Sequence, residues 1–209
     1  MSIQFILIFT ATVFIASIIP GPSMLLALTH GMQHGAKKSM ASAMGNVSVT
    51  LVQALVSIAG LGTVLMASET VFLVIKYAGA AYLIYMGITL LCASHMVDPS
   101  NRERSYTTTG LAKKMYLQAA FVTAGNPKAI VFFTAVFPQF IHPGAGFAFQ
   151  SFVLLSITSF IAFVCFMLYA ISGQKILSLF SKTGIARMVK NLIGTGFIGA
   201  GIGLAFSRR

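Results

Sequence analysis

The chain has 209 residues, of which 57% are hydrophobic and 8% are charged, and its mean hydropathy is +0.89. Soluble domains carry about a quarter charged residues, so this composition excludes a soluble protein and predicts an all-α integral membrane protein with a single domain, residues 1–209. The 14 Lys and Arg residues against 3 Asp and Glu give a net charge of +11. Most basic residues lie between apolar runs, which indicates membrane orientation and contact with the lipid bilayer rather than with nucleic acid.

Six apolar runs each have about the length that crosses the ~30 Å hydrocarbon core of a bilayer. We expect these transmembrane helices at Ile3 to Leu28, Met40 to Ala67, Val71 to Ser94, Met115 to Ile141, Phe147 to Ser172 and Met188 to Phe206. The polar gap at 95–114 separates a first half, residues 1–94, from a second half, residues 115–209. Because each half has three spans, the sequence predicts two three-helix repeats with inverted orientations.

Basic residues predict which side of the membrane each loop occupies. Ten of them lie in the gaps after the first, third and fifth spans: Lys37, Lys38, Arg102, Arg104, Lys113, Lys114, Lys175, Lys182, Arg187 and Lys190. Only Arg208, Arg209 and Lys76 fall toward the other side. The positive-inside rule therefore predicts that the loop at 95–114 is cytoplasmic and that both termini lie outside.

The first span is interrupted by Pro20-Gly21-Pro22, followed by Ser23. Two prolines around a glycine cannot continue a regular helix without losing hydrogen bonds. One interpretation is a kink or the end of the span. Because the apolar run resumes at Met24, the alternative is a broken helix, whose free amide and carbonyl groups bind small charged groups well.

The fourth span is interrupted in the same way by Asn126-Pro127-Lys128. From Met115 to Gln174, Lys128 is the only charged side chain. Ionisable residues within a span usually face a cavity or a partner, so Lys128 is predicted to bind an anionic group of the transported molecule. The alternative is a lysine that extends to the headgroups. Interrupted helices at matching places in inverted halves indicate a transporter binding site.

Other polar residues in the spans are weaker candidates. Asn46 and Gln53 share one face of the second span and either line a cavity or bond to other helices. Tyr82 in the third span either packs or faces the cavity. His30 and His34 have a spacing that can bind a metal, but we interpret them as interfacial and predict no metal site. The fifth span carries no candidate side chain.

The chain resembles the LysE/RhtB amino-acid exporters of bacteria, most closely the homoserine/threonine type, over essentially its whole length. The matching motifs are Pro20-Gly21-Pro22, the stretch from Lys76 to Leu83 with Gly87, and Asn126-Pro127-Lys128-Ala129, which continues into Phe132-Phe133 and Phe137-Pro138-Gln139-Phe140. The chain departs from the family pattern at Ser23, where Asn is common, and at Val49 and Thr50, where many members have Gly and an acidic or polar residue.

The resemblance implies a multi-pass protein of the inner membrane that exports small amino acids from the cytoplasm, driven by protons. Lys128 and a helix N-terminus would bind the substrate carboxylate, whereas carbonyls freed at Pro20-Gly21-Pro22, with the Asn46 and Asn126 amides, would bind its ammonium. The complete set of candidate substrate-binding residues is Pro20, Gly21, Pro22, Ser23, Asn46, Gln53, Tyr82, Asn126, Pro127 and Lys128.

The acidic residues Glu69, Asp98 and Glu103 all lie between the predicted spans. Lys128 is therefore the leading candidate for the proton carrier, because desolvation disfavours its charged form. The sequence has no ATP-binding loop, and we predict no cofactor. The alternatives are an ion or metal efflux channel, which usually needs buried carboxylate, Cys or His clusters, and a membrane enzyme, which needs a nucleophile–base constellation. In the sixth span, Gly199 and Gly203 form a pair that can serve an intramolecular contact or a homodimer.

Overall fold

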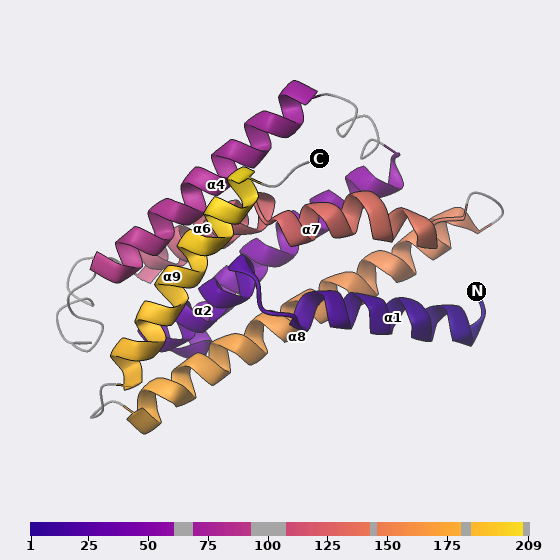
Figure 1. Ribbon diagram of the computed structural model, residues 1–209. Helices are drawn as coiled ribbons and strands as arrows, with labels where there is room; N and C mark the ends of the chain where they lie inside the picture. Colours follow the sequence, from indigo (N-terminus) through magenta and orange to yellow (C-terminus); the bar gives the residue numbers. More distant parts are fainter. Residues whose placement is uncertain (61–68, 93–107, 143–145, 181–184, 207–209) are drawn as a thin grey trace.

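The computed structural model describes residues 1–60, 69–92, 108–142, 146–180 and 185–206. Within these ranges all regular structure is helical and no strand is present. The elements, in chain order (Figure 1), are α1 Ile3–Ile18, α2 Pro22–Ile58, α4 Glu69–Cys92, α6 Thr108–Ala124, α7 Pro127–Val131, the π-helical turn η1 Phe132–Val136, the 3-10 turn η2 Phe137–Phe140, α8 Phe147–Phe180 and α9 Ile185–Phe206. The predicted all-α class is confirmed.

Several of these helices are suited to crossing a membrane. Among the described residues, Pro22–Ile58 and Phe147–Ile176 are long and apolar enough to span it, and Gly110–Ala124 with Pro127–Phe140 passes the same test as one span bent by 55°. Two further apolar helices, Ile3–Ile18 and Ala80–Thr89, are shorter. Two helices, or three if the bent pair is one span, are therefore long and apolar enough to cross a membrane among the described residues, whereas six spans in two inverted halves stay a prediction.

The end of the first predicted span and the start of the second differ from expectation. The polar stretch 29–39 is not a loop, because α2 is helical on both sides of a single turn residue, Gly35, at φ 78°. Glycine adopts this left-handed backbone region without the clash that a Cβ would cause. The amide of Ala36, which resumes the helix, donates to Gln174 Oε1 of α8 at 2.6 Å. The turn is thus held in place by the neighbouring helix.

Two other predicted boundaries also change. Helix α6 begins at Thr108, so residues 108–114 are helical although we predicted them as loop, and residues 93–107 lie outside the described ranges. Helix α8 continues past the predicted end of the fifth span to Phe180. In both places the helix extends beyond the apolar run into polar sequence, which apolar length alone cannot predict.

Helix α2 is the centre of the packing, in contact with α8 along one side and with α6 along another. The α2–α8 contact is close, because a Cβ added at Gly31 would overlap the carbonyl of Ala170, and the α2–α6 contact is close at Gly45, where a Cβ would overlap the carbonyl of Tyr116. Helix α1 lies along α8, and α4 and α9 pair with each other (Figure 1). The two broken helices are thereby brought to the same region.

Candidate functional site

The two helix interruptions predicted from proline are present. Helix α1 ends at Ile18 and α2 begins at Pro22, while α6 ends at Ala124 and α7 begins at Pro127. In each case proline occupies the first turn of the new helix, where its missing N–H costs nothing and its fixed φ suits the helix. The residue before each proline is extended, Gly21 at ψ −177° and Asn126 at ψ 110°, as the proline ring requires.

A chain of buried hydrogen bonds joins the two breaks. Asn126 Nδ2 donates to Ser23 Oγ at 3.0 Å, and Thr123 Oγ1 donates to Asn46 Oδ1 at 2.8 Å. Because the Thr123 hydroxyl has only one proton, the 3.2 Å contact between Ser23 Oγ and Thr123 Oγ1 makes Ser23 the donor. The bonds therefore run in one direction, from Asn126 through Ser23 and Thr123 to Asn46, and every one of these four side chains is buried.

Lys128 connects the breaks through a second route. Its backbone N–H donates to Asn126 Oδ1 at 3.1 Å, which caps α7, and its Nζ donates to the carbonyl of Ile19 at 2.6 Å. A Cβ placed on Gly21 would lie 3.5 Å from Nζ. The half-buried ammonium thus sits beside the C-terminus of α1, where a cation is favoured, and beside the N-terminus of α2.

A tyrosine that was not among the predicted site residues holds the end of α1. The hydroxyl of Tyr169, in α8, donates to the carbonyl of Ile18 at 2.9 Å. The fifth span, which was predicted to carry no candidate side chain, thus contributes a contact to the first break at Tyr169. A tyrosine in a Phe-rich span gives no signal of its own, because its partner lies 151 positions away in the sequence. Carbonyls left free at a helix end need such partners.

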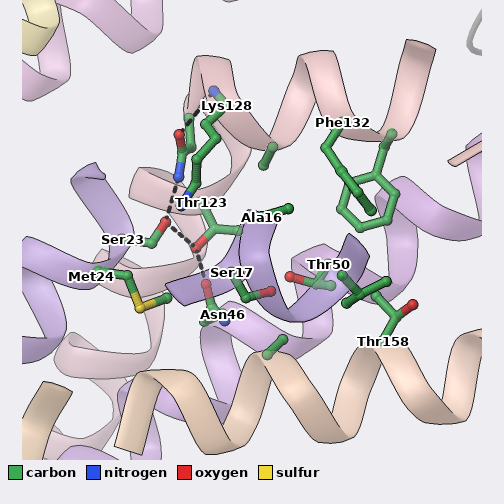
Figure 2. A pocket seen from close by; sticks show the side chains of 15 residues that line it. Ala16, Ser17, Ser23, Met24, Asn46, Thr50, Thr123, Lys128, Phe132 and Thr158 are labelled. Carbon is green, nitrogen blue, oxygen red and sulfur yellow. Dashed lines mark hydrogen bonds between the residues drawn. The ribbon is translucent and has the colours of Figure 1, made fainter. Parts of the chain in front are cut away.

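A cavity of about 60 Å³ lies between the two breaks and α8. One buried water requires about 10–15 Å³, so the space holds several waters or a small polar molecule. Figure 2 shows the side chains around it. Its polar lining includes Ser23, Asn46, Thr50, Thr123, Asn126, Lys128 and Thr158, and its apolar lining includes Met24, Phe132 and Phe133.

The predicted site residues fall into three groups around this cavity. Four of them line it: Ser23, Asn46, Asn126 and Lys128. Five lie next to it: Pro20, Gly21, Pro22 and Pro127 form the breaks, and Gln53 Nε2 donates to the Thr123 carbonyl at 3.4 Å. Tyr82 is elsewhere, because its ring lies 6.0 Å from that of Phe121 and it is absent from the cavity lining. Thr123 was not predicted, since a lone threonine in an apolar run gives no distinctive pattern.

Of the two histidines of α2, His30 is buried and His34 is partly exposed. His30 is 3% exposed, and its Nδ1 lies 2.6 Å from Ser42 Oγ, while the predicted interfacial position of the pair stays a prediction. The cause of the His30 burial is the continuation of α2 beyond Leu28 into a region covered by α8 at Gly31. Within the described ranges no group of three or more His, Cys, Asp or Glu side chains is placed to bind a metal ion.

Two broken helices whose ends meet at a polar cavity in a helical membrane protein define the architecture of a secondary transporter. The comparison with known families agrees with this class. The chain belongs to the LysE type translocator family, which it matches over residues 14–208. The predicted family is therefore confirmed, and the prediction of a transporter rather than an enzyme is confirmed by the relatives in that family.

Curated relatives cover nearly the whole chain. It is 30% identical to the homoserine/homoserine lactone efflux protein of Salmonella typhimurium, over 92% of this chain and 91% of that protein. It is 29% identical to the leucine efflux protein of Klebsiella pneumoniae, over 90% of this chain and 88% of that protein. No solved structure matches the chain significantly.

Proposed function

We propose that this chain exports small amino acids of the homoserine or threonine kind from the cytoplasm, and that the cavity between the two helix breaks is the substrate site. One observation carries the proposal: the Lys128 ammonium lies next to the N-terminus of α2, which has no side-chain cap. A cation and the two backbone amides that the first turn leaves uncapped, those of Ser23 and Met24, in one place form a site for a carboxylate.

The carboxylate end of the substrate is expected at Gly21, Ser23 and Lys128. Proline at the first position of α2 has no N–H, and no side chain caps the amides that follow it. These amides and the positive end of the helix dipole favour an anion. An arriving carboxylate would draw Lys128 Nζ away from the Ile19 carbonyl, which it contacts at 2.6 Å.

The same movement prepares a place for the substrate's ammonium. Once Lys128 turns to the carboxylate, the Ile19 carbonyl at the negative end of α1 is left without its donor. The ammonium of an α-amino acid is adjacent to its carboxylate, and Ile19 is two residues from Gly21, so both groups can bind at one break. The Asn46 and Asn126 amides, which line the cavity, complete this binding region.

The export direction and the kind of substrate rest on the relatives. One is named for leucine efflux and another for efflux of homoserine and homoserine lactone. Both names describe export of small amino acids or their derivatives. The polar lining at Thr50 and Thr158 favours a substrate with a polar side chain.

We assign to the protein six spans in two inverted halves, placed in the bacterial inner membrane with both termini outside. Support comes from the packing, in which α2 contacts both α8 and α6, α1 contacts α8, and α4 contacts α9, so that each of these contacts joins one element from each half. The basic residues give the orientation. A cysteine introduced at position 100, in a variant lacking Cys92 and Cys165, should react with a membrane-impermeant reagent only after the cells are opened; labelling in intact cells would contradict the orientation.

The test of the function is efflux of preloaded, labelled homoserine, threonine and leucine from cells with and without the protein. Lys128→Ala should reduce export by up to about a hundredfold at equal protein amount, because a hydrogen bond to a charged group is worth roughly 1.5–3 kcal/mol. Lys113→Ala, which removes an exposed lysine of α6, is the matched control and should be neutral. Accumulation of metal ions instead of amino acids in cells lacking the protein would contradict the proposal.

We also propose that Lys128 is the proton carrier that couples export to the proton gradient. Glu69 lies at the start of α4, and the other two acidic residues lie outside the described ranges. An arginine at position 128 keeps its proton, so Lys128→Arg should lose uphill export driven by a proton gradient while retaining substrate exchange. Both rates are measured in vesicles containing the purified variant. Normal uphill export by Lys128→Arg would remove lysine as the proton carrier and leave the substrate site in place.

A further inference from the structure

Thr158 of α8 presents a buried hydroxyl that no part of the described protein satisfies. Its side chain is 2% exposed and lines the cavity, and its Oγ1 has no hydrogen-bond partner. An unsatisfied buried hydroxyl destabilises a fold, and buried polar groups are almost always paired. A group that is unpaired at the wall of a binding cavity is suited to bond to whatever fills the cavity.

Other hydroxyls on the same helix show that Thr158 had an alternative. Ser156 donates to the Phe152 carbonyl at 2.8 Å, Ser159 to the Leu155 carbonyl at 2.7 Å, and Ser172 to the Leu168 carbonyl at 2.8 Å. This bond to the carbonyl four residues earlier is the usual arrangement for serine and threonine in apolar helices. Thr158 does not make it, so its hydroxyl is available to a ligand.

The position of Thr158 relative to Lys128 indicates which part of a substrate its hydroxyl would bind. Both residues line the cavity, and Figure 2 shows them at opposite ends of the group of lining side chains. Thr50 of α2 lies toward the Thr158 end. A substrate whose carboxylate and ammonium are held at the Lys128 end would therefore extend its side chain toward Thr158 and Thr50.

We propose that Thr158, with Thr50 beside it, binds a hydroxyl or carbonyl on the substrate's side chain and makes the protein select homoserine-like over leucine-like substrates. The inference rests on the proposed function and adds which substrates the site selects. A site built to hydrogen-bond a substrate group rejects an analogue that lacks the group far more strongly than an apolar pocket rejects an added hydroxyl. Leucine would leave the Thr158 hydroxyl unpaired, whereas homoserine would satisfy it.

The experiment measures export of homoserine and of leucine in the same cells and reports their ratio, which does not depend on protein amount. The variant Thr158→Val keeps the shape of the side chain and removes the hydroxyl. We expect the homoserine-to-leucine ratio to fall roughly tenfold, mainly through slower homoserine export. Thr158→Ser, which keeps a hydroxyl, should restore the ratio to within about twofold of the parent.

Ser159→Ala is the matched control, because it removes a hydroxyl from the same helix that is already bonded to the Leu155 carbonyl. It should leave the ratio unchanged. If Thr158→Val does not accumulate, Thr158→Ala gives a second variant without the hydroxyl for the same measurement. An unchanged ratio in the variants without the hydroxyl, or a parent protein that prefers leucine, would overturn the inference. A parent protein that exports neither amino acid would instead overturn the proposed function.

Discussion

Both helix breaks have a proline in the first turn of the new helix, but the new helices are capped differently. At the second break, Asn126 Oδ1 accepts from the Lys128 amide and caps α7. At the first break, Gly21 precedes Pro22 and no side chain caps α2. At the second break a side chain of the break itself caps an amide of the new helix, whereas at the first break no side chain caps the amides of α2.

The carbonyl ends of the breaks differ in the same sense. After α6, the amides of Gly125 and Asn126 donate back to the carbonyls of Phe121 and Thr123 at 3.0 and 3.2 Å, and after α1 the Ile19 amide donates back to the Ile15 carbonyl at 3.3 Å. After α1, the carbonyls of Ile18 and Ile19 are held by side chains from other parts of the chain. The first break therefore supplies backbone carbonyls, and the side chains that hold them come from the second break, at Lys128, and from α8, at Tyr169. When one of these side chains moves, the carbonyl that it held becomes free to bind a ligand.

After the loss expected for Lys128→Ala, the largest effect is expected from removing the cap of the second break. Asn126→Ala removes a cap worth about 1 kcal/mol and the buried bond to Ser23 Oγ, worth about another 1 kcal/mol. We expect a lower unfolding temperature in detergent and at least a tenfold loss of homoserine export. A parent-level unfolding temperature and parent-level export in Asn126→Ala would show that the second break does not depend on the Asn126 cap.

The control for this prediction is Ser2, the N-cap of α1, which is not among the residues that line the cavity. The Ser2 Oγ accepts from the Phe5 amide at 3.2 Å at an exposed helix start. Ser2→Ala removes a cap of the same kind and should cost at most about 1 kcal/mol. Export should remain at the parent level, which separates the loss of a cap from the loss of the site.

The open amides of the first break predict a smaller and more selective effect. In Gly21→Ala the new methyl group would lie 3.5 Å from Lys128 Nζ and Cε, an ordinary contact, and φ at this position is −150°, which alanine adopts. The fold should be unchanged. The methyl group occupies the place proposed for the carboxylate, so the half-saturating homoserine concentration should rise roughly tenfold.

Export kinetics as a function of cytoplasmic homoserine measure this change. Gly199→Ala is the matched control, because an added Cβ there meets no described atom within 4 Å. An unchanged half-saturating concentration in Gly21→Ala would show that the carboxylate binds somewhere other than the open break, and the two breaks would then lose their proposed division of roles.

The sequence predicted those parts of the site that change the backbone. Proline and glycine at 20–22 and proline at 127 act on their own local conformation, so both breaks could be located from the residues alone. A lysine within an apolar run is conspicuous for a similar reason, since lipid cannot solvate it. Asn46 was found as a polar residue inside a span, although its partner, Thr123, was not.

The residues that sequence reasoning missed depend on distant contacts. Thr123, Thr158 and Tyr169 are common in helices, and their roles come from where other helices place them. Ser23 and Asn126 are 103 positions apart, and no local pattern relates them. The polar stretch around Gly35 was interpreted as a loop because charge and glycine usually mark one. Packing of α2 against α8 and the Gln174 contact instead hold that stretch as a helix with a single turn residue.

The smallest effect is expected from the support that α8 gives to the first break. Tyr169→Phe removes only the hydroxyl that donates to the Ile18 carbonyl, and the ring keeps its packing. Such a bond contributes about 1 kcal/mol, and Lys128 still holds the adjacent Ile19 carbonyl. We expect export to fall by no more than about fivefold in Tyr169→Phe, while Tyr85→Phe, at an exposed tyrosine of α4, should have no effect.

The informative comparison is the double variant of Tyr169→Phe with Lys128→Ala, measured by unfolding temperature. If both side chains hold the end of α1, their combined loss should exceed the sum of the single losses, because residues that share one structural element couple. Additive losses would mean that Tyr169 supports α8 alone, and that the first break depends on Lys128 without help from the fifth span.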